Sequence, residues 1–230
     1  GVSLEGSTRG IDFDRCVIVA NTNGGISANA ATIQSNRWNR GVIWNSPVAI
    51  TAFSNALTVS NSVLGGGATL FGNHAVVGDF NVVGPPAVPG AGFATFSDLQ
   101  NAGRGWARSV RADPLFANAA AGDFHLKSVV GRFNPATGLY DTNDVLHSPA
   151  IDLGDPGLAF EDEPAPNGGR LNVGLHGGTA EASLSRTNGW IQLLSHNDGG
   201  TMNVQAGSWV RWEAGGYAPG ATVSIWISRD

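Results

Sequence analysis

The sequence predicts an all-β protein whose larger part is a parallel β-helix, a solenoid of short strands stacked coil upon coil. Three observations support this fold class. The 230 residues include 33 glycines and only 13% charged residues, a composition that suits many short strands and tight turns. The apolar runs are short and rich in β-branched side chains, with no long amphipathic stretch. The runs also recur at nearly constant offsets, which is typical of solenoids.

The stretch Arg40–Asn61 is predicted to form one complete coil. Its β-rich runs are Val42–Asn45, Val48–Thr51 and Leu57–Ser60, with bends at Ser46–Pro47 and Ser54–Asn55. Each run is too short to fold alone, and no hairpin signal such as Asn-Gly lies beside it. Three runs separated by two bends are therefore expected to stack on neighbouring coils.

The preceding residues repeat this pattern. Val17 precedes Val42 by 25 residues, Ile26 precedes Ile50 by 24, and Thr32 precedes Leu57 by 25. A third coil, with an offset of about 20, is expected to use Ser62–Gly65, Ala68–Phe71 and Ala75–Gly78. The asparagines at the bends are candidates for amide ladders from coil to coil, namely Asn21, Asn45 and Asn61.

Prolines then interrupt the repeat. Because proline cannot donate to a ladder, the segment 84–92, with Pro85, Pro86 and Pro89, is expected to be a loop that leaves the solenoid. A short helix is predicted over Thr95–Asn101, capped by Thr95, with Asp98 in its first turn and Phe96 and Leu99 packing it down. Together these features define a loop insertion at about 84–110.

The next part of the chain is predicted to alternate short strands with long irregular segments. Strands or strand-and-turn units are expected at 109–116, 123–126, 148–156 and 171–175, with irregular segments at 130–146 and 157–170. Residues 177–184 are expected to end this domain.

Five motifs in this part occur in a fixed order: Ala-Asp-Pro-Leu-Phe (112–116), Gly-Asp-Phe-His-Leu-Lys (122–127), Ser-Pro-Ala-Ile-Asp-Leu-Gly-Asp-Pro (148–156), Pro-Asn-Gly-Gly-Arg (166–170) and Asn-Val-Gly-Leu-His-Gly-Gly-Thr (172–179). The series resembles the C-terminal half of bacterial right-handed parallel β-helix proteins, which are large and secreted or surface-attached. The resemblance covers roughly residues 10–185. It implies a fold and an extracellular location, but it is a poor guide to activity because fold does not fix function.

The composition and residue pattern of 187–230 differ from those of the β-helix domain, which is predicted to span residues 1–186. They hold four of the seven tryptophans, and alternation indicates strands at 190–194, 207–212 and 222–228, with turns at 198–200 and 219–220. The segment resembles the first strands of immunoglobulin-like sandwich modules. Such modules need about 80–100 residues. We therefore expect a truncated module, and a chain cut or processed from a larger protein.

Composition argues against several function classes. With a net charge of −5, one lysine (Lys127) and no basic tract, nucleic acid is not an expected partner. The lone Cys16 permits neither an internal disulfide nor a cysteine-based zinc site, and its apolar neighbours favour a packed residue over a reactive thiol. No apolar run approaches the ~20 residues of a membrane span.

Carboxylates and histidines are the first candidates for chemistry. Asp152, Asp155 and Glu161–Glu163 could form a glycosidase pair or bind calcium, but the turn-like context favours a structural role for them. The histidines are scattered without HxH or HxxxH spacing, so no metal site is predicted among His74, His125, His147, His176 and His196. No catalytic residue is assigned, the substrate-binding residues stay open, and calcium is the only cofactor alternative.

A polysaccharide lyase would need cationic groups and a base. Candidate cations are Arg37, Arg40, Arg104, Arg108, Arg111 and Lys127, but no lyase motif accompanies them. Trp38, expected at a bend before the central coil, could stack on a sugar, although a packed tryptophan in an exposed loop is favoured.

The leading hypothesis is a non-catalytic extracellular structural or adhesive segment of a larger surface or filament protein. Its expected partners are further copies or neighbouring modules. The alternative is a carbohydrate-active β-helix, a lyase, hydrolase or glycan-binding module. Its groove would lie near Arg40, Trp44 and the Arg104–Arg111 loop, and a polysaccharide would be its partner.

Overall fold

The computed structural model describes residues 1–30, 32–53, 56–196, 209–218, 220–224 and 226. The bend at 54–55, the turn at 198–200, residues 207–208, Pro219 and parts of the run 222–228 lie outside the described residues. The described chain is nearly all β, and its first half is a parallel β-solenoid of about four turns, as predicted.

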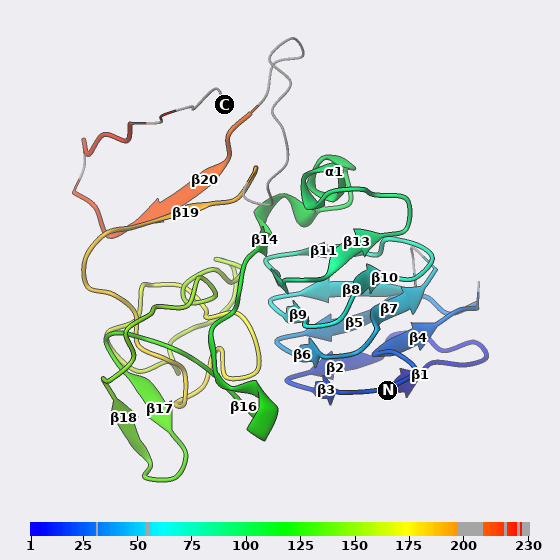
Figure 1. Ribbon diagram of the computed structural model, residues 1–230, viewed down its shortest axis with the longest axis horizontal. Coiled ribbons are helices and arrows are strands. Elements are labelled where there is room, and N and C mark those ends of the chain that lie inside the picture. Colours follow the sequence, from blue (N-terminus) through cyan, green and yellow to red (C-terminus); the bar gives the residue numbers. More distant parts are fainter. Residues whose placement is uncertain (31, 54–55, 197–208, 219, 225, 227–230) are drawn as a thin grey trace.

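Three parallel sheets form the solenoid, and each of the first four coils contributes one strand to each sheet (Figure 1). The last, partial coil adds a strand to the first and third sheets only. The first sheet contains β1 (Val2–Ser3), β4 (Ile26–Ala28), β7 (Val48–Ala52), β10 (Thr69–Phe71) and β13 (Val88–Gly90). The second contains β2 (Asp12–Asp14), β5 (Asn36–Asn39), β8 (Leu57–Ser60) and β11 (Val77–Asp79). The third contains β3 (Val17–Val19), β6 (Val42–Trp44), β9 (Val63–Gly65), β12 (Val82–Gly84) and β14 (Val110–Arg111).

The register confirms two of the three predicted offsets. Val17 pairs with Val42, and Ile26 pairs with Ile50. The alignment of Thr32 with Leu57 is wrong, because Asn36 is the partner of Leu57. Residues 29–35 separate β4 from β5, whereas only residues 53–56 separate β7 from β8. Because the first of these connections is longer, the strand that pairs with Leu57 begins at Asn36 and not at Thr32.

The bend between the second and third sheets has the same backbone in four successive coils. Arg15, Arg40, Asn61 and Phe80 occupy it with φ values of 50°, 50°, 51° and 54°, in the left-handed region that few non-glycine residues adopt. The repetition turns the chain sharply between β2 and β3 and between their successors. It also aligns these four side chains in a row along the solenoid axis.

Buried side chains next to this bend form a ladder between coils. The Gly41 N–H donates to Ser62 Oγ (3.1 Å), the Ser62 N–H to Asn81 Oδ1 (3.0 Å), and the Asn81 N–H to Ser109 Oγ (3.0 Å). The amide ladder predicted from asparagines is found at Asn61, which donates to Asn39 Oδ1 (2.9 Å). In the described part of the chain, Asn21 and Asn45 make no amide pair with each other or with Asn61.

The proline-rich segment is not wholly a loop, which corrects the prediction for 84–92. β13, which contains Pro89, pairs with β10 at the end of the first sheet. An edge strand tolerates proline because one side of its backbone needs no ladder partner. The predicted helix is confirmed as α1 (Phe96–Asn101), where Thr95 and Asp98 form a capping box.

The 3₁₀ turn η1 (Trp106–Arg108) contacts α1 and β11 at the end of the solenoid. The Trp106 side chain is fully buried and donates its indole N–H to the Val76 carbonyl (2.8 Å). Its ring lies edge-on to Phe71 and Phe96. A side chain at Gly78 would collide with this ring, so the glycine lets the tryptophan cap the core.

Residues 112–188 cover the outer face of the third sheet with little regular structure (Figure 1). They contain β15 (Phe116–Asn118), η2 (Ala119–Ala121), β16 (Asp123–Leu126), β17 (Arg132–Asn134) and β18 (Leu139–Asp141), paired as two antiparallel hairpins. Residues 171–175, predicted as a strand, form no strand: the chain is irregular at 171–172, bends at 173–174 and enters a turn at Leu175.

A second core fills the space between this segment and the third sheet. Its members include the outward valines Val42, Val63, Val82 and Val110, with Phe116, Phe124, Leu126, Ile151, Leu153 and Val173 across from them. Val17 is the register equivalent of Val42 in the first coil but is 42% exposed. The valine row is thus buried only in the later coils.

The last described elements, β19 (Trp190–Leu193) and β20 (Trp212–Gly215), form an antiparallel pair. Arg211 donates to Asn101 Oδ1 of α1 (2.9 Å), and Glu213 forms an ion pair with Arg170. These two contacts hold the pair against both the solenoid end and the irregular segment. Among the described residues, no helix has the length and apolarity to cross a membrane.

Candidate functional site

A groove lined mainly by polar and charged side chains lies on the outer face of the second sheet. Outward positions of β2, β5 and β8 place Asp12, Arg37 and Thr58 in one row, and Asp14, Asn39 and Ser60 in the next. Between them, Phe13 and Trp38 point into the core, because side chains alternate along a strand. The groove has a volume of about 410 Å³, and Leu158 from the irregular segment forms part of its wall.

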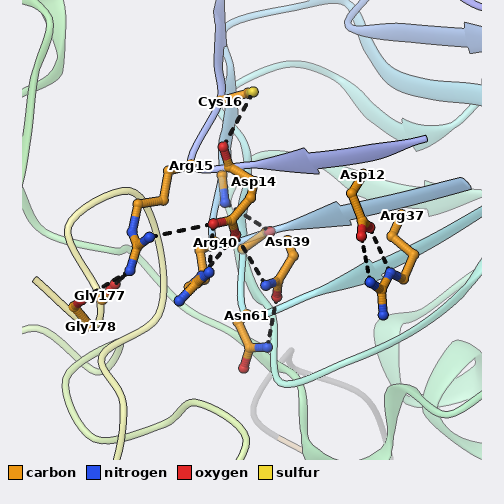
Figure 2. Close-up of polar contacts among 12 residues, drawn as sticks. Asp12, Asp14, Arg15, Cys16, Arg37, Asn39, Arg40, Asn61, Gly177 and Gly178 are labelled. Carbon is orange, nitrogen blue, oxygen red and sulfur yellow. Dashed lines mark hydrogen bonds and ion pairs between the residues drawn. The ribbon is translucent and has the colours of Figure 1, made fainter. Parts of the chain in front are cut away.

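Ion pairs between coils occupy this groove (Figure 2). Arg37 binds both carboxylate oxygens of Asp12, with Nε 2.6 Å from Oδ1. Arg40 binds Asp14 in the same two-pronged way, with Nε 2.8 Å from Oδ1. The hydrogen bonds from Arg37 lower the pKa of Asp12 below its ordinary value.

Asparagines extend the network toward the irregular segment. Asn39 donates to Asp14 Oδ1 (3.2 Å), and Asn61 donates to Asn39. Asn61 Oδ1 then accepts the Asp155 N–H (2.7 Å), and Arg15 donates to the Gly178 carbonyl (2.9 Å). The row of left-handed bends therefore joins the groove to the segment that walls it.

This chemistry suits hydrogen bonding to a polar ligand better than proton transfer. A general base needs a proton-accepting group free to reach its substrate. The carboxylates of Asp12 and Asp14 are each held by a guanidinium, and each guanidinium is neutralised in return. The groove therefore offers hydrogen-bond donors and acceptors that are already paired with one another.

The residues predicted for a carbohydrate groove do not gather in one place. Arg40 lies in the groove, but Trp44 lies on the third sheet, edge-on to Phe116 at 5.1 Å. Arg108 lies over the Phe80 ring at 5.2 Å, and Arg111 lies on β14. Arg104 and Lys127 make backbone hydrogen bonds, to Gly78 and Leu115 respectively.

Trp38 and Cys16 are both packed against the solenoid core, although Trp38 does not lie in the expected loop. The tetrapeptide 37–40 is not an exposed loop, since residues 36–39 form β5. Trp38 is indeed packed, with 1% of its surface exposed, so it cannot stack on a sugar. Cys16 is half-buried against the solenoid core, in line with a packed residue.

The carboxylates at 152–163 act as turn residues. Asp152 is buried and accepts from Ser185 Oγ (2.7 Å) and the Gly168 N–H (3.1 Å), and burial raises its pKa. Asp155 accepts from the Gly157 N–H (2.9 Å). Glu163 Oε1 accepts the N–H groups of Asn172 (2.8 Å) and Gly178 (2.7 Å), and burial raises the pKa of Glu163 to about 7. Each carboxylate thus organises a loop, as the turn interpretation predicts.

The spacing of the histidines in the sequence did not indicate one cluster of two histidines and a glutamate. His125 and His176 lie 51 positions apart, yet their rings stack with centroids 3.6 Å apart, and both face Glu181. The other described histidines are dispersed: His74 stacks on Phe53, His147 is largely buried with a pKa lowered to about 4 by burial, and His196 contacts Ser195. Only the fold of the irregular segment brings the pair together, so no short motif could indicate it.

Comparison of the chain with protein-family models, with curated proteins and with solved structures finds no match in any of the three.

Proposed function

We propose that this chain is a non-catalytic, extracellular structural or adhesive segment of a larger surface or filament protein. The observation that carries the proposal is the pairing of charges on the polar face. Asp12 with Arg37 and Asp14 with Arg40 join successive coils, so the charged groups of that face bind one another. Because its charges are already paired between coils, this face favours the role of a stiff rod with a polar surface over that of a reaction centre.

The test is incubation with a panel of acidic and neutral polysaccharides. Lyase products are read by ultraviolet absorbance, and hydrolase products by new reducing ends. We expect neither signal above that of a heat-denatured sample. Product release that disappears in Asp12→Asn or Arg37→Ala, and survives in the exposed control Glu5→Gln, overturns the proposal.

Glycan binding without cleavage is the second candidate, and the 410 Å³ groove favours it. Sugar hydroxyls match an array of Asp, Asn and Arg side chains, because each group offers several donors or acceptors. Binding would be measured by calorimetry with soluble glycans. A ligand whose affinity falls in Arg37→Ala but not in Glu5→Gln places an adhesive role in the groove. Equal affinity in both variants removes the groove from that role.

The bacterial, secreted origin and the sandwich module are part of the same proposal. They are supported by the motif series at 112–179 and by the alternating strands β19 and β20. Sequencing the gene on both sides of this segment tests them. A secretion signal and the remaining strands of a sandwich are expected, and flanking cytosolic enzyme domains would contradict the proposal.

A further inference from the structure

The two stacked histidines and Glu181 form a compact donor set in the irregular segment, away from the polar groove. His125 lies on β16, and the other two residues lie on the turns that follow residue 174. His125 Nε2 is 3.5 Å from Glu181 Oε2, and His176 Nδ1 is 3.2 Å from the same oxygen. One ligand atom from each residue can be chosen so that all three lie within 4.8 Å of one another.

The second nitrogen of His125 is already fixed. Its Nδ1 lies 2.7 Å from Asp123 Oδ1, the arrangement in which a carboxylate accepts the N–H of a metal-binding imidazole. That hydrogen bond leaves Nε2 as the lone-pair atom, directed at the cluster. His125 is only 4% exposed, and its Nε2 has no hydrogen-bond partner. A buried nitrogen without a partner is costly, so the site calls for a ligand.

The donor types suit a transition-metal ion as well. Neutral imidazoles and one carboxylate are the donors that zinc and similar ions accept, whereas calcium prefers oxygen alone. Zinc–nitrogen and zinc–oxygen bonds of about 2.0–2.2 Å require ligand atoms roughly 3.3 Å apart around a tetrahedral ion.

We propose that His125 Nε2, His176 Nδ1 and a Glu181 carboxylate oxygen bind one divalent transition-metal ion of the zinc type, and that Asp123 is a positioning residue for His125. The Glu181 side chain is 49% exposed, so solvent reaches the site and water can fill a fourth position. Bound there, the ion would join β16 to the turn at 174–181, which no regular secondary structure connects.

Cobalt and zinc titrations test the proposal on the full chain after treatment with a chelator. We expect one Co²⁺ per chain with intense visible absorption bands of a four- or five-coordinate ion, displaced by Zn²⁺ and not by Ca²⁺. Zn²⁺ should also raise the unfolding temperature, because it binds only the folded chain. Weak bands of a six-coordinate ion, or less than one ion bound per chain, overturn the proposal.

Two substitutions separate ligation from folding. His176→Gln and Glu181→Gln should each weaken zinc binding more than the ~10–100-fold lost with a positioning group. Glu181→Gln removes a half-exposed charge without loss of volume, so it keeps the test valid if His176→Gln fails to fold. The matched controls His74→Gln and Glu161→Gln should bind as wild type. Unchanged affinity in Glu181→Gln contradicts the proposed donor set.

Asp123→Asn tests the positioning role. The amide can still accept the His125 backbone N–H, but it holds the imidazole less firmly than a carboxylate does. We expect an affinity loss of about 10–100-fold together with a shift in the Co²⁺ bands. A loss of folding stability with unchanged bands and affinity would show that Asp123 is structural only.

Discussion

The solenoid at 1–111 and the irregular segment at 112–188 both bury an apolar core, yet they are held together in different ways. In the solenoid, one backbone bend and one side-chain ladder repeat from coil to coil. In the irregular segment, different turns are held by different hydrogen bonds. For example, Ser148 Oγ donates to the Pro114 carbonyl (2.6 Å), and Asn172 donates to the Ser183 carbonyl (2.8 Å). Repetition spreads stability over many equivalent contacts, whereas irregular packing depends on single buried polar groups.

The largest effect is expected at the end of the solenoid, where repetition stops. Trp106→Ala should lower the free energy of unfolding by about 3–5 kcal/mol, the usual cost of removing a buried large aromatic residue. The cap contacts Phe71 and Phe96, so the loss would expose the last coil. Urea denaturation measures it, with the 84% exposed Trp209→Ala as control. A loss below about 1 kcal/mol would mean that the coils do not need a closed end.

The second prediction concerns a single buried group of the irregular segment. Burial raises the folded-state pKa of Glu163 from 4.5 to about 7, so folding favours its protonated form. Its contribution to stability is complete below pH 4.5 and is lost as the pH rises toward 7. The loss is on the order of 3 kcal/mol, at 1.36 kcal/mol per pKa unit.

Glu163→Gln imitates the protonated acid and keeps an oxygen for the N–H groups of Asn172 and Gly178. Unfolding free energies measured between pH 4.5 and 8, with a chelator present, should fall more steeply for the wild type than for this variant. Glu161→Gln, an exposed carboxylate, should keep the wild-type slope. If unfolding free energy depends on pH in the same way for the wild type and Glu163→Gln, then Glu163 is not the group that causes the loss of stability.

The contrast between the two regions also explains what the sequence could predict. Val17, Val42 and Val63 reveal the coils because the same position must face the same neighbour in each turn. The offset fails only where a bend changes length, as it does between Ala28 and Asn36. In the irregular segment, the motifs have no periodicity from which the contacts between its turns could be predicted.

The two candidate sites also differ in how far the sequence could predict them. The pairing of Asp12 with Arg37 follows from the 25-residue offset once the strand register is known, whereas the sequence alone placed Arg37 at a bend. His125 and His176 meet because β16 and the turn at 174–178 both pack on the third sheet. That contact depends on the packed structure of a segment without repeats, which explains why the spacing of the histidines gave no signal.

A third prediction tests the ladder itself. Ser62→Ala removes the acceptor of the buried Gly41 N–H, and an unsatisfied buried donor costs about 1–3 kcal/mol. If stability in the solenoid is spread over repeated contacts, the loss should lie near the lower end and leave unfolding a single transition. Ser3→Ala, at an exposed hydroxyl, is the control. A separate early transition for the first coils would show instead that the ladder is interrupted at one point.

The smallest effect is expected from the ion pairs of the groove. A double-mutant cycle of Asp14→Ala and Arg40→Ala should give a coupling energy of about 0.2–1 kcal/mol, because the two side chains are 37% and 23% exposed. The coupling should decrease as salt is added. In the cycle, the cost of placing alanine at the left-handed position of Arg40 cancels. A coupling well above 1 kcal/mol would make the polar face a main support of the coil stack. A small, salt-sensitive coupling leaves these charges available to a ligand, since displacing such a pair costs the fold little.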